Sequence, residues 1–164
     1  MKPVAWFLAV AMLAGCASAA AKATVKFRKL QEGAYAAASY DQPAVVIARD
    51  AETYGRIWNN LIGRGAAPAV DFAKESVVFL IDQQRSTGGY SLVPAGVTLS
   101  GGNAVVKVTM RHPQRGNVVT QVLTSPFVVI AVAAPNLGSA EWVDAEDGKP
   151  VARDAKAQNK STAQ

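Results

Sequence analysis

VVFLIDQQRSTGGYS, residues 77–91, joins a five-residue apolar run to a glycine pair and a tyrosine. The unbroken apolar run predicts a strand that is covered on both faces. Adjacent glycines among strands indicate a tight turn, a bulge or a close approach of another backbone. Ser86 and Thr87 can add side-chain hydrogen bonds, and Tyr90 offers a flat ring with a polar tip. The stretch is either a binding loop or only the turn that the sheet requires, and turns are the commoner case.

Strand-like runs follow this stretch at residues 90–99, 104–111 and 117–134. Pro94 predicts an edge position or a bulge in the first run, and Gly101-Gly102-Asn103 has the composition of a hairpin turn. The second run alternates apolar and polar residues, which indicates one buried and one solvated face. The apolar residues 127–134 are too few for a membrane span and predict a central strand.

One amphipathic helix is predicted before the apolar run. Asp50 is a good N-cap, and Gly63 is placed to end the helix. The apolar residues between them recur at helical spacing and form one stripe: Tyr54, Ile57, Trp58, Leu61 and Ile62. Gly55 weakens the helix by about 1 kcal/mol relative to alanine, so the stripe must pack on a sheet. Trp58 is interpreted as a core anchor rather than a ligand contact.

Shorter strand-like segments lie at residues 25–28 and 44–48, and residues 141–143 and 150–151 suggest a terminal hairpin. We therefore predict an α+β, mostly β fold. It consists of an antiparallel sheet of about six strands, sandwich-like or barrel-like, with the helix of residues 51–62 packed on it. The side chains expected to share its core are Trp58, Phe79, Val106, Val108, Val129 and Ile130.

The first residues indicate export. Lys2 precedes an apolar segment that is too short to cross a bilayer, which takes about 20 residues, so it reads as a secretory signal. Leu13-Ala14-Gly15-Cys16 resembles a bacterial lipobox, in which cleavage precedes a cysteine that is lipidated. We expect residues 1–15 to be a lipoprotein signal peptide and Cys16 to carry the lipid. An ordinary signal peptide cleaved after Ala19 or Ala21 is the alternative.

The expected organisation follows from this anchor. Residues 16–23 form a predicted tether, because those after the cysteine are Ala, Ser and Lys, which are small and flexible. Residues 24–152 are expected to form a single domain, and residues 153–164 a disordered tail. Ala17 and Ser18 follow the cysteine where an aspartate would signal inner-membrane retention. The expected location is therefore the cell envelope, as an outer-membrane lipoprotein facing the periplasm, or otherwise an exported protein.

Composition argues against several classes of function. The formal charge is +5, near +4 once Lys2 is removed, and its positive charges are scattered, so no nucleic-acid footprint is visible. The single cysteine excludes an intramolecular disulfide, and His112, the one histidine, lies in a predicted turn. Asp71, Glu75 and Asp82 flank one strand and are interpreted as strand-end residues. We therefore predict no enzymatic activity, no metal site and no cofactor.

The central part of the chain resembles the PrcB-like family, the C-terminal domain of a lipoprotein of a protease complex. The resemblance covers about residues 70–134, and its most specific part is Thr87-Gly88-Gly89-Tyr90-Ser91. Thr124-Ser125-Pro126-Phe127 also fits. Ser86 stands where the family often has proline, and Asp82-Gln83-Gln84 where a glycine is common. The resemblance implies a non-catalytic lipoprotein that binds or stabilises a protein partner, in the named case an exported protease.

Three functional hypotheses remain open from the sequence. The first is an accessory lipoprotein that binds a protein partner through Arg85, Ser86, Thr87, Gly88, Gly89 and Tyr90. The second is a protease inhibitor similar to the chagasin-like family, whose three binding loops would correspond to Thr87-Gly88-Gly89-Tyr90, Gly101-Gly102 and Ser125-Pro126-Phe127. The third is a structural envelope lipoprotein with no specific partner.

Overall fold

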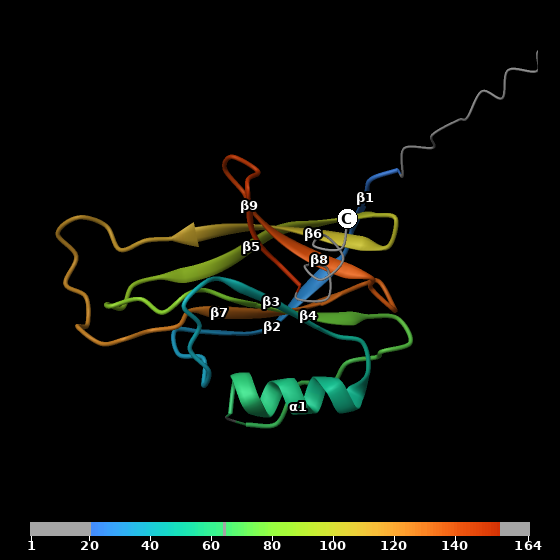
Figure 1. Cartoon of the computed structure of the whole chain (residues 1–164), viewed down its shortest axis with the longest axis horizontal. Coiled ribbons are helices and arrows are strands. Elements are labelled where there is room, and N and C mark those ends of the chain that lie inside the picture. The colour runs from blue at the N-terminus through green and yellow to red at the C-terminus, as the bar shows by residue number, and fades with distance from the viewer. Residues whose placement is uncertain (1–20, 64, 155–164) are drawn as a thin grey trace, which may run out of the picture.

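Two β-sheets face each other, and one helix packs on the outside of the smaller sheet (Figure 1). The computed structural model describes residues 21–63 and 65–154. The five-stranded sheet has the order β1 (Ala23–Val25), β5 (Ser91–Ser100), β6 (Asn103–Arg111), β8 (Ser139–Asp144) and β9 (Pro150–Arg153). The four-stranded sheet has the order β2 (Phe27–Gly33), β7 (Phe127–Val132), β4 (Ser76–Ile81) and β3 (Ala44–Ala48). The helix α1 spans Ala51–Leu61.

The predicted fold class is confirmed: the fold is mostly β, a sandwich with one packed helix rather than a closed barrel. The strand count differs, with nine strands in the described ranges instead of about six. The pairing also differs in one place, because β6 and β8 run parallel, with Val106 opposite Trp142. The other strand pairs are antiparallel.

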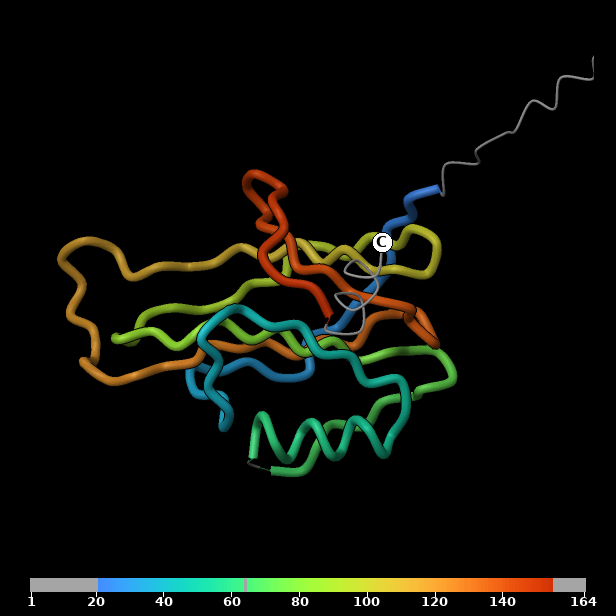
Figure 2. The backbone as a smooth tube through the Cα atoms, viewed as in Figure 1, coloured from blue at the N-terminus to red at the C-terminus, as the bar shows by residue number. Residues whose placement is uncertain are grey.

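The first strand-like segment divides between the two sheets. Val25 pairs with Val97 in the larger sheet, whereas Phe27 pairs with Val132 in the smaller one. Lys26 lies at the crossing, where its carbonyl accepts a hydrogen bond from the amide of Ala133 at 2.9 Å. Figure 2 shows this blue segment running obliquely from one layer to the other. The predicted domain start at residue 24 thus falls inside β1, and the predicted signal peptide and Cys16 lie outside the described residues.

The central strands β4 and β7 are buried on both faces, as the apolar run 77–81 predicts. The prediction of one shared core is wrong, because the two faces of these strands belong to separate apolar clusters. Val106, Val108 and Ile130 lie in the cluster between the sheets. Trp58, Phe79 and Val129 lie in the cluster between helix and sheet. Neighbouring side chains of a strand point to opposite faces, so Val129 and Ile130 face different layers.

The helix forms as its caps and stripe predict. The Asp50 side chain accepts a hydrogen bond from the Thr53 amide at 2.7 Å, and Gly63 has a φ of +67° just past the last turn. Tyr54, Ile57, Trp58 and Leu61 are buried on the helix side of the smaller sheet. Burial raises the pKa of the Tyr54 hydroxyl, which has no hydrogen-bond partner among the described residues.

Turn chemistry accounts for three further features. The register shifts between Pro94 and Gly96, which is the predicted bulge. Gly101 and Gly102 have φ values of +57° and +79°, as a tight hairpin turn with two positive φ angles requires. The terminal hairpin is also confirmed, as β8 and β9.

The predicted strand-like run of residues 117–134 is wrong in its first half. A strand begins only at Phe127, and residues 112–126 form a long irregular connection from β6 to β7. Val118, Val122 and Leu123 are exposed, so no second sheet covers them. Their β-branched and apolar composition is typical of a strand, but this connection forms only isolated bridges, Arg85 with Thr124 and Tyr35 with Ser125.

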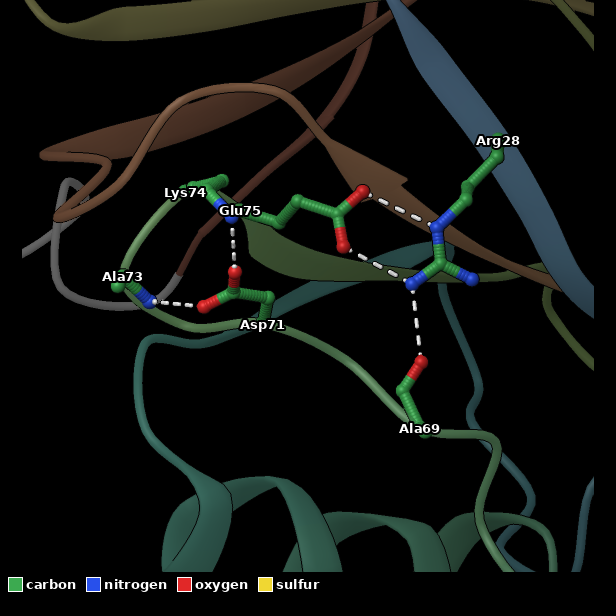
Figure 3. Close-up of polar contacts among 6 residues, drawn as sticks. All are labelled: Arg28, Ala69, Asp71, Ala73, Lys74 and Glu75. Carbon is green, nitrogen blue, oxygen red and sulfur yellow. Dashed lines mark hydrogen bonds and ion pairs between the residues drawn. The ribbon is translucent and has the colours of Figure 1, made fainter.

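An ion pair ties the segment before β4 to the edge strand β2. The Arg28 guanidinium donates to both carboxylate oxygens of Glu75 at 3.0 and 2.9 Å and to the Ala69 carbonyl at 3.0 Å, as Figure 3 shows. Asp71 accepts from the Ala73 amide and pairs with Lys74 at 2.8 Å. Two of the acidic residues flanking β4 therefore fix a loop.

We predict that Glu75 makes the stability of the fold depend on pH. Hydrogen bonds from Arg28 hold the pKa of the Glu75 carboxyl below its ordinary value of 4.5. A carboxyl whose pKa is lowered in the folded state stabilises the fold at pH values above its ordinary, unfolded-state pKa. This contribution is lost as the pH falls through the folded-state pKa. At pH 7, Glu75→Gln should lower the free energy of unfolding by about 0.5–1.5 kcal/mol, since Arg28 is half exposed.

Urea titrations of the wild type and Glu75→Gln check this prediction. The difference between the two should shrink as the pH is lowered from neutral to below 4.5, the ordinary carboxyl value. Subtracting the variant's free energy of unfolding from that of the wild type at each pH isolates the contribution of Glu75. The contributions of Asp50, Asp71 and Asp147, whose pKa values are also lowered, cancel in this difference. A difference that stays constant with pH would contradict the assignment.

A candidate binding surface at one end of the sandwich

Two loops meet at the end of the sandwich where β4 and β6 end. Residues 82–90 connect β4 to β5, and residues 112–126 project beyond the sheets on the left of Figure 1. The backbones of Arg85 and Thr124 exchange two hydrogen bonds, at 2.8 and 2.9 Å. The Gly88 amide donates to the Thr120 carbonyl at 2.9 Å. The two loops are therefore paired along part of their length and support each other.

The glycine pair is explained by this close approach. A Cβ on Gly88 would overlap the Thr120 hydroxyl. Gly89 has a φ of +91°, and a Cβ there would lie 3.0 Å from Pro113 and 3.2 Å from Val119. Side chains of the 112–126 connection therefore pack against both glycines, and one of its backbone carbonyls accepts from Gly88. The positive φ of Gly89 also fits a turn, so the pair serves both the turn and this close approach.

Arg85 holds the loop to the sandwich. Its guanidinium donates to both carboxylate oxygens of Asp82 at 2.7 and 3.0 Å, and the Asp82 side chain is fully buried. The same guanidinium lies 3.3 Å from the Met110 sulfur and 5.1 Å from the centre of the Tyr90 ring. Bidentate geometry fixes the direction of the side chain as well as its position. The third acidic residue that flanks β4 is therefore also paired with a cation.

Tyr90 is half-buried, neither sealed in the core nor fully displayed. The Arg85 guanidinium lies over its ring, and the centroid of the His112 ring is 5.7 Å from the Tyr90 centroid, with an interplanar angle of 83°. Ser86 and Gly89 are exposed, and Thr87 is half-buried, with its carbonyl accepting from the Thr124 hydroxyl at 2.9 Å. The predicted binding residues thus lie on one loop. Some of them, such as Ser86 and Gly89, are exposed to solvent, whereas others, such as Arg85, hold the loop in place.

Sequence reasoning missed the apolar residues of this end. In the described part of the chain, the large apolar side chains that are exposed are Tyr35, Val118, Val122 and Leu123. Val118 is fully exposed, and Tyr35 joins the group through a bridge to Ser125. Sequence spacing assigns residues 118–123 to a strand, so only the tertiary structure reveals them. We call Tyr35, residues 84–90 and residues 111–123 the loop-end surface.

A shallow depression of about 760 Å³ lies within the loop-end surface. Gly89, Arg111, His112, Pro113, Val118 and Val119 are among the residues that line it. It combines the guanidinium of Arg111 with the aliphatic side chains of Val118 and Val119. The predicted turn position of His112 is observed, and its side chain is exposed.

The chagasin-like arrangement is not formed. Ser91 pairs with Arg111 at the loop end of β5, whereas Gly101 and Gly102 follow Ser100 at the opposite end of the same strand. A surface shared by three loops would need all of them at one end, and the structure separates the second from the other two. Within residues 21–63 and 65–154, no group of three His, Cys, Asp or Glu is placed to hold a metal ion. No helix of those ranges is long and apolar enough to cross a membrane.

Comparison with known proteins finds a similarity in the central part of the chain. Residues 76–133 match the family model described as PrcB C-terminal. The match runs from β4 through β7, so it includes both central strands and most of the loop-end surface. No curated protein and no solved structure is significantly similar to the chain. The resemblance predicted over about residues 70–134 is confirmed by this match, and residues 76–133 are similar to the PrcB C-terminal family.

Proposed function

We propose that this protein is a non-catalytic accessory lipoprotein that binds or stabilises a protein partner through the loop-end surface. The leading candidate partner is an exported protease, because the family is that of a protease-complex subunit. The non-catalytic part of the proposal rests on the acidic residues around β4. Asp71, Glu75 and Asp82 each pair with a cation and hold a loop, so they are already used structurally.

One observation carries the proposal. The exposed large apolar side chains of the described residues all lie at the same end: Tyr35, Val118, Val122 and Leu123. Isolated exposed apolar residues are ordinary, but a group of them beside aromatic and arginine side chains is typical of protein interfaces. The buried Asp82–Arg85 pair and the close packing of Gly88 and Gly89 hold this group in place before any partner binds. Such preorganisation lowers the entropic cost of binding.

The proposed anchor is compatible with this surface. β1 begins at Ala23 and pairs beside the β5–β6 hairpin, at the end of β5 opposite to Tyr90. A ten-residue strand is about 33 Å long, so the loop-end surface lies at the far side of the sandwich from the start of β1. With Cys16 in a membrane, the surface would face away from the lipid and toward periplasmic proteins.

Crosslinking and affinity capture from envelope membranes test the proposal. The bait is the full-length protein, compared with Val118→Ser/Leu123→Ser, which removes exposed apolar area only. Lys26→Ser/Lys107→Ser is a matched control, since both lysines are exposed and lie outside the loop-end surface. Two truncated interface side chains should reduce recovery of a specific partner about tenfold or more, and the control should not.

The partner is identified by mass spectrometry, and its binding is repeated with the purified protein. If wild type and Val118→Ser/Leu123→Ser recover the same proteins in equal amounts, the loop-end surface is not the binding site. If neither bait recovers a protein above the level of an unrelated lipoprotein, the alternative of a structural lipoprotein without a specific partner replaces this proposal.

A further inference from the structure

The loop-end surface has an unusual charge pattern. The sequence contains no Asp or Glu from residue 83 to residue 140. Asp82, which precedes that stretch, is buried and paired with Arg85. From neighbouring elements, Glu32 pairs with Lys29 at 2.8 Å, and Asp41 is exposed beside Tyr40, whose carbonyl accepts from Gln84. No carboxylate lines the depression itself among the described residues.

Two arginines of this end have no carboxylate partner in the described ranges. Most of the other arginines in those ranges do: Arg28 pairs with Glu75, Arg49 with Asp154, Arg85 with Asp82 and Arg153 with Glu141. Arg111 and Arg115 are exposed and form no ion pair there. Arg111 lines the depression together with Val118 and Val119, and Arg115 lies between Gln114 and Gly116, which also line it. Positive charge and aliphatic surface therefore lie side by side.

We propose that the partner inserts an acidic and apolar polypeptide segment into this depression. Its carboxylates pair with Arg111 and Arg115, and an aliphatic side chain between them packs on Val118 and Val119. The inference rests on the proposed function and adds the chemistry that the partner must present. Opposite charges across an interface set partner choice and association rate, and the aliphatic contact contributes apolar burial.

Other occupants fit the same surface less well. Two uncompensated arginines fall short of the four to eight cations, roughly, that recognise anionic lipids, and no basic stripe suited to nucleic acid is present. A second copy of the chain in a symmetric dimer would bring arginines against arginines, which is unfavourable. The concave shape and paired loops suit a single segment of protein.

Binding of short fluorescent peptides by the full-length protein tests the inference. One peptide alternates glutamate with leucine, a second glutamate with serine, and a third lysine with leucine. Only the first should bind. Arg111→Glu/Arg115→Glu should weaken its binding about tenfold or more, whereas the control Lys26→Glu/Lys107→Glu changes net charge equally and should leave it within about twofold. Raising ionic strength from about 0.05 to 0.5 M should weaken binding severalfold.

Four results would overturn the inference. Two concern the peptides: the glutamate–leucine peptide does not bind, or the lysine–leucine peptide binds equally well. The third is that both double variants weaken binding equally. The fourth is arginine-dependent binding to phosphatidylglycerol vesicles that is tighter than binding to the peptide, which would assign the surface to lipid headgroups.

Capture experiments separate this inference from the proposed function. A partner that is lost with Val118→Ser/Leu123→Ser but retained with Arg111→Glu/Arg115→Glu would support binding at this end and reject an acidic segment.

Discussion

Arg85→Ala should lower the free energy of unfolding by about 3–5 kcal/mol, an unusually large loss for a residue on a loop. The substitution leaves the Asp82 carboxylate without its guanidinium partner, and that carboxylate is fully buried. An unpaired buried charge must either remain desolvated or take up a proton, and each costs stability. The loss is measured by urea unfolding at neutral pH.

Two comparisons make the Arg85 result specific. Arg153→Ala breaks the exposed pair with Glu141 and should cost less than about 1 kcal/mol. Asp82→Leu/Arg85→Met removes both charges and should recover much of the loss, because well-packed apolar residues often replace a buried ion pair without penalty. If Arg85→Ala costs no more than Arg153→Ala, the pair does not hold the loop.

The same substitution should loosen the loop-end surface. Arg85 exchanges backbone hydrogen bonds with Thr124, and its guanidinium lies over the Tyr90 ring. Without the fixed side chain, the hydrogen-exchange rates of the amides in this bridge should rise above their wild-type values. The rise should exceed that of the β4 amides, in proportion to the local loss of stability. Partner recovery should fall as well, since the binding residues lose the support of the sandwich.

Local features of the fold could be predicted from the sequence. Asp50 and Gly63 mark the helix ends, the apolar run of β4 indicates burial on both faces, and Gly101-Gly102 specifies a hairpin turn. Each of these signals acts within a few residues of itself. The alternation of β4 also separates its residues into two faces, but it does not say which layer covers which face. That is why the expected single core divides into two.

Non-local features could not be predicted. Val25 and Phe27 continue one alternating pattern, yet they belong to different sheets. The parallel pairing of β6 with β8 joins segments that are separated by the long loop, and no local pattern encodes it. At the candidate site, the sequence located the double glycine, but its physical reason is residues 113–120, far along the chain. The exposed Val118 was missed for the same reason.

Trp58→Ala should destabilise the fold by about 3–5 kcal/mol through the helix layer. Trp58 is 3% exposed, and the centroid of its ring lies 5.7 Å from that of Tyr54. Its indole nitrogen donates to the Gly65 carbonyl at 3.2 Å. The helix has only 11 residues and includes Gly55, so it is marginal without packing on the sheet. Thermal unfolding followed by circular dichroism measures the loss.

Tyr54→Phe is the matched control for Trp58→Ala. It keeps an aromatic ring in the same cluster and removes a buried hydroxyl that lacks a partner in the described residues. Its free energy of unfolding should therefore be unchanged or up to about 1 kcal/mol higher.

Unfolding of Trp58→Ala should remain a single transition, because both clusters share β4 and β7. Below that transition its partner binding should match the wild type, since an anchor of the core acts on stability alone. Weaker binding by a variant of unchanged stability would instead make Trp58 a ligand contact.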